Sequence, residues 1–408
     1  MSNKADSDLV RRQNRHLVLE ALRFAGQAPR IELGRRTGLS LATITSITTQ
    51  LLNEHLLMEA EDHGRQVSKR GRPSVDLRLN AAATKVLALK VAIDRFELVL
   101  ADYAGTRLAQ TAKTVPTFHL AAEAAAQEAS RFVAEFLAAN TVQPSAVRIM
   151  GIAVQGAADT VSGHLRWSPA FKNIDIPFAE PISRQTGIPC IISNDANMIA
   201  EGLMAREQYK YKGTAAVMFM GYGVGMGLVI DGKPYHGATG AAAEFGHMNH
   251  IPYGALCRCG RAGCLEAYAS DYGILRHAEG RPDNLPPSPS AVAPEVMQAL
   301  ESAARNGDVR ALSAHQKAGE AIGFGLARMI ALLNPDRIII SGPGLRAFDL
   351  VQPAILQALD DGVVGALRQN ISIESLPMDH DMILAGTIDK LLHDLDREIF
   401  ARADHAAI

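Results

Sequence analysis

A strand, a turn and a second strand ending in an apolar residue and an aspartate occur twice in this chain. The first copy ends at Ala101-Asp102, and the second, whose turn is rich in glycine, ends at Ile230-Asp231. A repeated unit of this kind indicates an internal duplication, because each copy can build a sheet and a core of its own. We therefore expect two α/β lobes with a cleft between them.

Apolar runs alternate with helical stretches from about residue 84 onward, which is the pattern of an α/β fold. Ala-rich helices are expected over 120–139 and 316–333, and a surface loop rich in Pro and Ser over 279–293. With 408 residues, 48% of them hydrophobic, the chain can bury sizeable cores, which excludes disordered and collagen-like classes. The predicted strands are 86–93, 96–101, 147–154, 189–192, 215–220, 226–230 and 337–341.

The sequence shows no signal for a membrane or an oxidising compartment. No apolar run approaches the roughly 18 residues of a membrane span, and the N-terminus lacks the apolar segment of a signal peptide. Of four cysteines, Cys190 sits in an apolar run and is expected in the core, while the other three cluster. A dispersed disulfide framework is therefore not expected, and we predict a cytoplasmic protein.

The first 82 residues differ from the rest and predict a winged helix-turn-helix. A helix over Arg30–Thr37 is followed by a turn at Gly38-Leu39, and Ser40 is placed to cap the next helix, whose apolar stripe includes Ile44 and Leu51. Two short strands around a polar segment then form the wing. Residues 1–80 hold 13 Lys and Arg against 9 Asp and Glu, so this head is basic on an acidic body.

A capped second helix after a tight turn is the geometry that enters the major groove, and a basic wing suits phosphates. The alternative is a three-helix docking domain with a solvated polar face. We favour operator DNA, read by a homodimer or tetramer because one half-site provides few contacts. The expected DNA-binding residues are Ser40, Leu41, Thr43, Thr45, Ser46, Lys69, Arg70 and Arg72.

Three cysteines fall within eight positions, in a segment whose two glycines allow the chain to fold round an ion. Tetrahedral zinc needs a fourth ligand, and a histidine stands ten residues upstream of the first cysteine. Four protein ligands leave no open position, so the Zn²⁺ is expected to be structural; the alternative is three unligated thiols. The expected ligands are His247, Cys257, Cys259 and Cys264.

Carboxylate, amide and imidazole groups indicate a site for a polar small molecule. Asn194 and Asp195 follow the apolar strand that ends at Ser193, and open α/β sheets bind ligands at the carboxyl ends of strands. Glu244, His247 and Glu266 add further acceptors, and such a cluster suits a molecule with many hydroxyls. Any one of these residues can instead be a cap or turn residue. The glycines from 221 to 227 fit either a phosphate-binding turn or close backbone packing.

These features together resemble the ROK family, named for repressors, open reading frames and sugar kinases, and specifically its winged-helix repressor branch. The segment Cys-x-Cys-Gly-x-x-Gly-Cys-x-Glu at 257–266 is the most specific mark, and the resemblance covers nearly the whole chain. It implies an actin-like, sugar-kinase fold of two ribonuclease-H-like lobes. It also implies sugar contacts from Asn194, Asp195, Glu244, His247 and Glu266, with Asp195 at the position of the kinases' base.

The resemblance also shows departures. Family kinases carry Asp-x-Gly-Gly-Thr in the first phosphate loop, where this chain has Lys90, Ala92, Ile93 and Asp94. Side chains there block the close approach of phosphates, and Asp94 repels them, so we expect no kinase activity. Tyr222 stands where kinases commonly carry Thr, which points the same way.

The sequence therefore predicts a transcriptional repressor that binds a carbohydrate effector, a neutral sugar or polyol. The expected domains are a winged helix at 1–82, a first lobe at 83–200 with a C-terminal helix at about 380–408 packed back on it, and a second lobe with the zinc loop at 201–379. The alternatives are a sugar kinase carrying a DNA-binding domain, and a repressor whose body binds a protein. ATP-dependent ADP release distinguishes the first, and unchanged regulation in a Glu244→Ala, Glu266→Ala variant the second.

Overall fold

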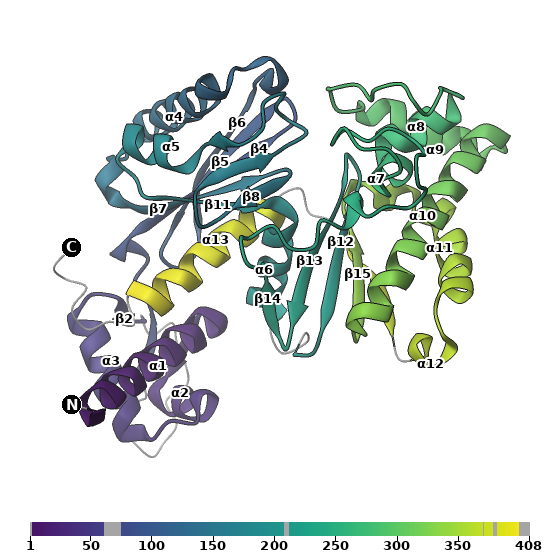
Figure 1. Ribbon diagram of the computed structural model, residues 1–408. Helices are drawn as coiled ribbons and strands as arrows, with labels where there is room; N and C mark the ends of the chain where they lie inside the picture. The colour runs from purple at the N-terminus through teal and green to yellow at the C-terminus, as the bar shows by residue number, and fades with distance from the viewer. Residues whose placement is uncertain (1, 61–74, 208–211, 370, 378–381, 400–408) are drawn as a thin grey trace.

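The computed structural model describes residues 2–60, 75–207, 212–369, 371–377 and 382–399. Figure 1 shows three regions: an N-terminal helical head, a first α/β lobe next to it, and a second α/β lobe beyond. Within the described residues, no helix is long and apolar enough to cross a membrane.

The head contains the predicted helices and strands. Helices α1 (Ser2–Ala25), α2 (Arg30–Thr37) and α3 (Leu41–Asn53) pack against a sheet in the order β1-β3-β2. Strands β2 (Leu57–Glu59) and β3 (Asp76–Leu79) pair antiparallel as the wing requires, and β1 (Gln27–Pro29) adds a strand that was not predicted. The wing segment with Lys69, Arg70 and Arg72 lies outside the described residues.

The first lobe is built on a five-stranded sheet in the order β11-β7-β4-β5-β6. Strand β4 pairs antiparallel with β5 and parallel with β7, and the edge strands continue these two directions. Helices α4 (Ala122–Ala139) and α5 (Ala179–Thr186) cover one face, and α13 (Met382–Asp394) covers the other (Figure 1). The strands are β4 (Lys85–Ala92), β5 (Arg95–Asp102), β6 (Arg107–Thr114), β7 (Val147–Val154) and β11 (Cys190–Asn194).

The second lobe repeats this topology strand for strand, in the order β14-β13-β12-β15-β16. Strand β12 pairs antiparallel with β13 and parallel with β15, as β4 does with β5 and β7. The predicted internal duplication is therefore confirmed. The strands are β12 (Ala215–Met220), β13 (Val224–Ile230), β14 (Lys233–Tyr235), β15 (Arg337–Ser341) and β16 (Ser372–Ser375).

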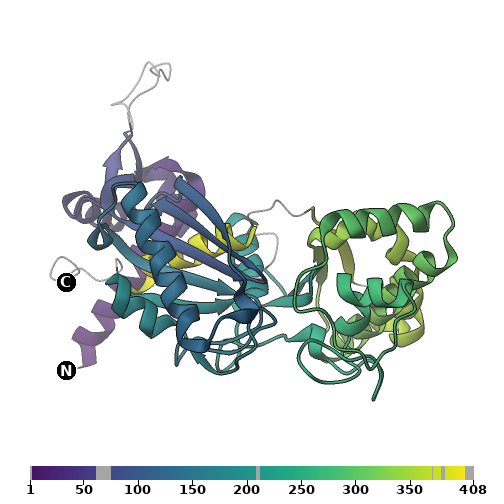
Figure 2. The same ribbon diagram turned by 90° about the horizontal axis from the view of Figure 1, so that it is seen from above.

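Helices of the second lobe gather on the side of its sheet away from the first lobe, as the view from above shows (Figure 2). Helix α10 begins at Val309, seven residues before the predicted start, because the side chain of Asp308 caps it by accepting from the Ala311 N–H. The helices are α7 (Glu266–Ala269), α8 (Asp271–Ala278), α9 (Pro294–Arg305), α10 (Val309–Leu333), α11 (Phe348–Gly362) and α12 (Gly365–Arg368).

Two helices join the three regions. Helix α6 (Asp195–Glu207) lies against β13 of the second lobe and packs closely on α13, whose Gly386 has no room for a side chain beside the Met198 carbonyl. Helix α13 continues as a π-helical turn (Leu395–Ile399) that contacts α1 of the head. Leu19 and Leu22 of α1 share one buried cluster with Leu391 and Leu395. The head therefore shares a core with the body.

Some elements were not predicted from the sequence. A small antiparallel sheet of β8 (Ala157–Asp159), β9 (His164–Trp167) and β10 (Ile176–Pro177) extends from the first lobe. Cys190, expected in the core, is half-buried at the start of β11 against that lobe's core, where burial raises its thiol pKa to about 12. The C-terminal helix was expected over about 380–408; α13 runs from Met382 to Asp394, its π-helical turn reaches Ile399, and 378–381 and 400–408 lie outside the described residues.

Candidate metal and ligand site

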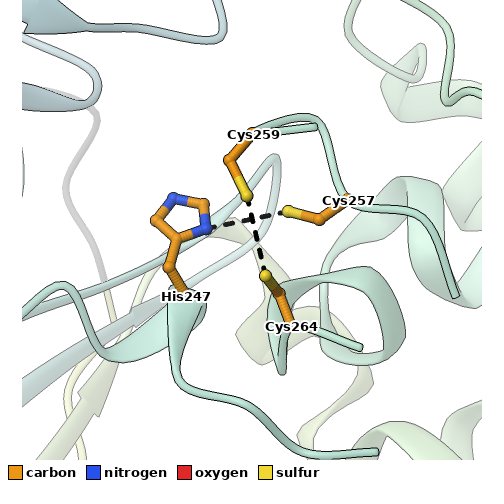
Figure 3. A group of neighbouring side chains, drawn as sticks. All are labelled: His247, Cys257, Cys259 and Cys264. Atoms are coloured by element: carbon orange, nitrogen blue, oxygen red, sulfur yellow. Dashed lines mark hydrogen bonds between the residues drawn. The ribbon is translucent and has the colours of Figure 1, made fainter. Parts of the chain in front are cut away.

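His247, Cys257, Cys259 and Cys264 converge on one point (Figure 3), and their ligand atoms all lie within 4.8 Å of one another. The Cys259 and Cys264 sulfurs are 3.6 Å apart, and His247 Nδ1 is 3.7 Å from the Cys257 sulfur. A tetrahedral zinc with Zn–S bonds of about 2.3 Å places its sulfur ligands about 3.8 Å apart. The four predicted ligands therefore form a group that can hold a metal ion of that size.

The chain reaches this geometry through tight turns that only glycine fits. Gly263 has φ +86°, and a Cβ there would lie 1.8 Å from the Ile251 carbonyl oxygen. Isolated bridges Asn249↔Cys264 and Leu256↔Ala262 hold the two arms of the loop together. The backbone at Gly263 can pass close to the Ile251 carbonyl because glycine has no side chain, and this tight turn brings the cysteines together.

The electrostatics of the group favour a positive charge at its centre. Burial disfavours a charged imidazole, but hydrogen bonds to Cys259 and Cys264 raise the pKa of His247 to about 11. Hydrogen bonds with Cys257 and Cys264 lower the pKa of Cys259, and hydrogen bonds with Cys259 and Cys264 raise the pKa of Cys257. Thiolates are the form in which cysteine binds metal ions.

The other side of His247 faces residues of the predicted polar cluster. Its Nε2 lies 3.8 Å from Glu244 Oε2, and Glu244 Oε1 accepts from Asn194 Nδ2 at 3.5 Å. Burial raises the pKa of Glu244, and the His247 imidazole opposes this rise. Residues from β11 and from the loop after β14 therefore meet beside the metal group.

Trp167 on β9 also contacts His247, and sequence reasoning missed it. The two ring centroids are 4.9 Å apart in an edge-to-face arrangement. Trp167 is the single tryptophan of the chain, and its indole offers an apolar surface beside the His247 imidazole. The only sequence signal is its rarity, because the strand that carries it was not predicted.

Asp195 begins helix α6 and is the most strongly perturbed carboxylate of the cluster. Burial raises its pKa to about 7, against the opposing charge of Lys90, and the carboxylate of Glu244 adds to the rise. A carboxyl group poised near neutrality is typical of functional sites.

The side chains of Asn194 and Glu266 make hydrogen bonds within the chain. The Asn194 amide donates to the Gly156 carbonyl at 2.8 Å and accepts from the Ala196 and Asn197 N–H groups, so it caps α6. Glu266 is 7% exposed and accepts from the Val224 N–H at 3.2 Å and from the Tyr272 hydroxyl at 3.2 Å. Both residues therefore position their neighbours, and Glu266 ties the metal loop to the glycine-rich turn.

Side chains from elsewhere in the first lobe bond the N–H groups of the turn between β4 and β5. Asp94 has φ +55°, and its N–H donates to Thr117 Oγ1 at 3.0 Å. The Ile93 N–H donates to Gln155 Oε1 at 3.5 Å. Lys90 pairs with Glu97 at 3.0 Å. These backbone donors are thus bonded within the chain.

The predicted recognition helix exposes a face with small and apolar side chains. Ser40 caps α3 by accepting from the Thr43 N–H at 3.1 Å, as predicted. Leu41, Thr45 and Ser46 are exposed, whereas Ile44 and Leu51 are fully buried. Four of the described predicted DNA contacts, Ser40, Leu41, Thr45 and Ser46, are therefore exposed at the start of α3, and Thr43 is partly buried.

Comparison with known proteins identifies the family. Residues 86–387 match the ROK family. The chain is a member of the ROK family. The match covers both lobes of the body, including the metal loop and Asp195.

Relatives with the same extent are ROK-type repressors. The DNA-binding transcriptional repressor Mlc of Escherichia coli K12 is 28% identical over 387 residues, 93% of each chain. The xylose repressor of Bacillus subtilis 168 is 25% identical over 378 residues, 91% of this chain and 92% of that repressor. These alignments include the N-terminal head as well as the body.

Solved structures show that the fold is shared more widely than the repressor architecture. A ROK family transcriptional regulator, a homologue of the E. coli Mlc protein, matches with a TM-score of 0.77 and 23% identity, over 97% of this chain and 99% of that one. A ROK family glucokinase from Streptomyces griseus matches with a TM-score of 0.60 and 23% identity, over 75% of this chain. The ROK body here therefore has the predicted actin-like, two-lobed fold.

Proposed function

We propose that this ROK protein is a DNA-binding transcriptional repressor whose effector is a neutral sugar or polyol. The observation that carries the proposal is a helix-turn-helix with a free recognition face in the same chain as a cluster of carboxylate, amide, imidazole and indole groups. The relatives with matching length are repressors, which supports the same conclusion. In this proposal residues 1–82 read the operator, and the lobes at 83–200 and 201–379 hold the effector.

Recognition of DNA rests on α3. Ser40, Thr43, Thr45 and Ser46 would contact base edges or phosphates, and the exposed Leu41 suits the methyl group of thymine. Lys69, Arg70 and Arg72 of the wing would neutralise phosphates. Two or four copies of the chain would present paired heads to a palindromic operator.

Effector binding would use Asp195, Glu244 and His247, with Trp167 as an apolar platform. Carboxylates accept from sugar hydroxyls, and the raised pKa of Asp195 allows it to donate as well as accept near neutral pH. Asn194 and Glu266 would act by holding α6 and the metal loop in place. Two acidic groups disfavour a phosphorylated ligand.

A structural Zn²⁺ would occupy the group of one histidine and three cysteines. The donor set is the one that tetrahedral zinc prefers, and four protein ligands saturate it. The ion would orient His247 toward Glu244, since metal-bound histidines are fixed by the partner of their second nitrogen.

The same geometry argues against phosphoryl transfer. Phosphate loops need free backbone N–H groups, and those of Ile93 and Asp94 are bonded to Gln155 and Thr117. Lys90 and Asp94 would replace residues that family kinases use in this loop. A sugar kinase carrying a DNA-binding head is the second candidate, favoured by the position of Asp195, and ATP-dependent ADP release with a bound sugar would establish it.

Regulation would pass along packed helices. Asp195 is the first residue of α6, α6 packs on α13, and α13 with its π-helical turn packs on α1 of the head. An effector that favours one position of α6 would shift the orientation of the heads, and DNA would in turn shift effector affinity. A coupling of 1.4 kcal/mol changes operator affinity about tenfold.

The test is a thermal-shift screen of the zinc-loaded protein with neutral monosaccharides, inositols, amino sugars and sugar phosphates. We expect one neutral compound to raise the melting temperature and to change Trp167 fluorescence. Asp195→Asn and Glu244→Gln should abolish both signals, whereas Glu180→Gln, an exposed carboxylate on α5, should not. If no compound binds at millimolar concentration, the effector is not a small carbohydrate.

Operator binding is tested by selection from a random duplex library, followed by titration at several salt concentrations. Thr45→Ala should weaken binding to the selected sequence, and Thr114→Ala, exposed on β6, should not. An effector that leaves affinity unchanged across the salt range would refute the coupling.

A further inference from the structure

His16 and Glu20 on α1 and His393 on α13 form a second group with metal-binding chemistry. One ligand atom from each residue lies within 4.8 Å of the others. His16 and Glu20 are four residues apart on one helix face, and His16 Nε2 is 4.0 Å from Glu20 Oε2. The imidazole of His393 meets that of His16 edge-to-face with ring centroids 5.1 Å apart.

One ring nitrogen of His16 lacks a hydrogen-bond partner among the described residues. His16 Nδ1 is buried and accepts or donates no hydrogen bond among the described residues. The His16 side chain is 19% exposed and that of Glu20 34%, so an ion can reach the group from solvent. Burial lowers the pKa of both His16 and His393, which keeps the rings neutral and able to bind a metal at neutral pH.

We propose that His16, Glu20 and His393 bind a divalent transition metal ion, such as Zn²⁺ or Ni²⁺, which fastens the N-terminal head to the body. Two imidazoles and a carboxylate suit these ions, and three protein ligands leave at least one position for water. The carboxylates of Asp394, Glu201 and Asp396 add negative potential around His393, and the guanidinium of Arg397 opposes them.

A metal ion at this position would link the head to the body. The contact of α1 with α13 and its π-helical turn already contains the ion pair of Arg23 with Asp396 at 2.8 Å and the shared core of Leu19 and Leu391. A metal bridge one turn from these contacts would restrict rotation of α1 relative to α13. The proposal concerns the head–body contact and does not depend on the identity of the effector or of the operator.

The two metal groups should differ in affinity. The group at His247 already has separations near those of a tetrahedral ion, with three thiolate ligands. In the second group, tetrahedral ligands at about 2.0–2.2 Å from a metal would be about 3.3 Å apart, so His16 and Glu20 must approach by a fraction of an ångström. We therefore expect a weaker, exchangeable site that a mild chelator empties first.

The first experiment measures metal stoichiometry on the full-length protein. After mild chelation we expect one tightly held zinc per chain, and titration with Zn²⁺ or Ni²⁺ should add one weaker equivalent. His393→Asn should remove the weaker equivalent, and Glu20→Gln, which alters a partly exposed carboxylate, should lower its affinity by at least about tenfold. His119→Gln, an exposed histidine of the first lobe, is the matched control and should bind as the unmodified chain does.

Spectroscopy and hydrogen exchange complete the test. Co²⁺ added to the zinc-loaded protein should give absorption without thiolate-to-cobalt charge transfer, because the second site has no sulfur ligand. Metal should slow amide exchange in residues 8–25 of the unmodified chain and leave that of His393→Asn unchanged. A second equivalent that persists in both His393→Asn and Glu20→Gln overturns the site, and metal binding with no change in α1 exchange overturns the bridge.

Discussion

The two lobes of the body have the same strand order and differ at the turn between their first two strands. In the first lobe, Asp94 occupies a left-handed conformation, and side chains from elsewhere in the lobe bond the turn's N–H groups. In the second lobe, glycines make the turn, and close packing requires them: a Cβ at Gly223 would lie 2.8 Å from Glu266 Oε2. The hydrophobic pattern thus sets the strand order in both lobes, whereas the residues and contacts of the turn differ between them.

The metal loop exists only in the second lobe, and it explains part of this difference. Glu266, which follows the last cysteine of the loop by two residues, accepts from the N–H of Val224 at the start of β13. The second turn is therefore fixed by contacts with the metal loop, and the first turn by Thr117 and Gln155. Substitutions in the second turn and its metal loop should therefore lower the free energy of unfolding more than substitutions in the first turn.

The largest effect should come from the metal loop. Cys259→Ser removes a ligand, so bound zinc should fall and the free energy of unfolding should drop by on the order of 3 to 5 kcal/mol. Elemental analysis and denaturant titration measure both, with Cys190→Ser of the first lobe as the control. Full zinc occupancy in Cys259→Ser would contradict the ligand assignment.

A smaller loss should follow Gly223→Ala. The added methyl group displaces the Glu266 carboxylate and breaks its bond to Val224, so we expect about 1–3 kcal/mol of destabilisation. Gly365→Ala, where a Cβ meets nothing within 4 Å, should be close to neutral. Equal melting temperatures for the two variants would show that packing does not hold the second turn.

The Asp195 carboxyl group should make the stability of the folded protein depend on pH. Its folded pKa of about 7 lies above the unfolded value, so the folded state binds the extra proton, and stability falls as pH rises from about 4 to 7. Asp195→Asn should flatten the dependence of the melting temperature on pH across that window, while Glu180→Gln should not. An unchanged slope in Asp195→Asn would mean that the carboxylate is well solvated.

The smallest effect should come from the first turn. Asp94→Gly relieves the cost of positive φ but adds freedom to the unfolded chain, so stability should change by less than about 0.5 kcal/mol. Asp94→Ala keeps the positive φ and should cost about 1 kcal/mol. ATP binding in Asp94→Gly, measured by calorimetry, would show that a single side chain closes the phosphate loop.

Much of the fold was predictable because its hydrophobic patterns are strong. The apolar runs that became β4, β7, β12 and β15 are buried on both faces, as central strands of an α/β sheet are. Strand β6 was missed because it lies at the edge of the first sheet, buries no residue fully and mixes polar with apolar residues at its exposed positions. The small sheet that carries Trp167 was missed for a related reason, since its strands are two to four residues long.

Some features of the candidate site were likewise predictable from the sequence, and others were not. The convergence of His247 with the three cysteines was predictable because the cysteines are close in sequence and tetrahedral zinc takes four ligands. The bond from Asn194 to the Gly156 carbonyl joins residues 38 positions apart, and the contact of Trp167 with His247 joins residues 80 positions apart. No local pattern encodes such contacts.

Sequence alone determined the order of the lobes, the capped helix α3 and the group of one histidine and three cysteines, because each depends on local periodicity or on the spacing of chemically distinctive residues. Only the tertiary structure decided that the N–H groups of the first turn are occupied, that α6 and α13 cross at glycines, and that His16 faces His393 across 377 residues of chain. These are contacts between surfaces of separately formed elements. Which surfaces meet is set by how the cores pack, and the residue pattern within a single segment does not predict it.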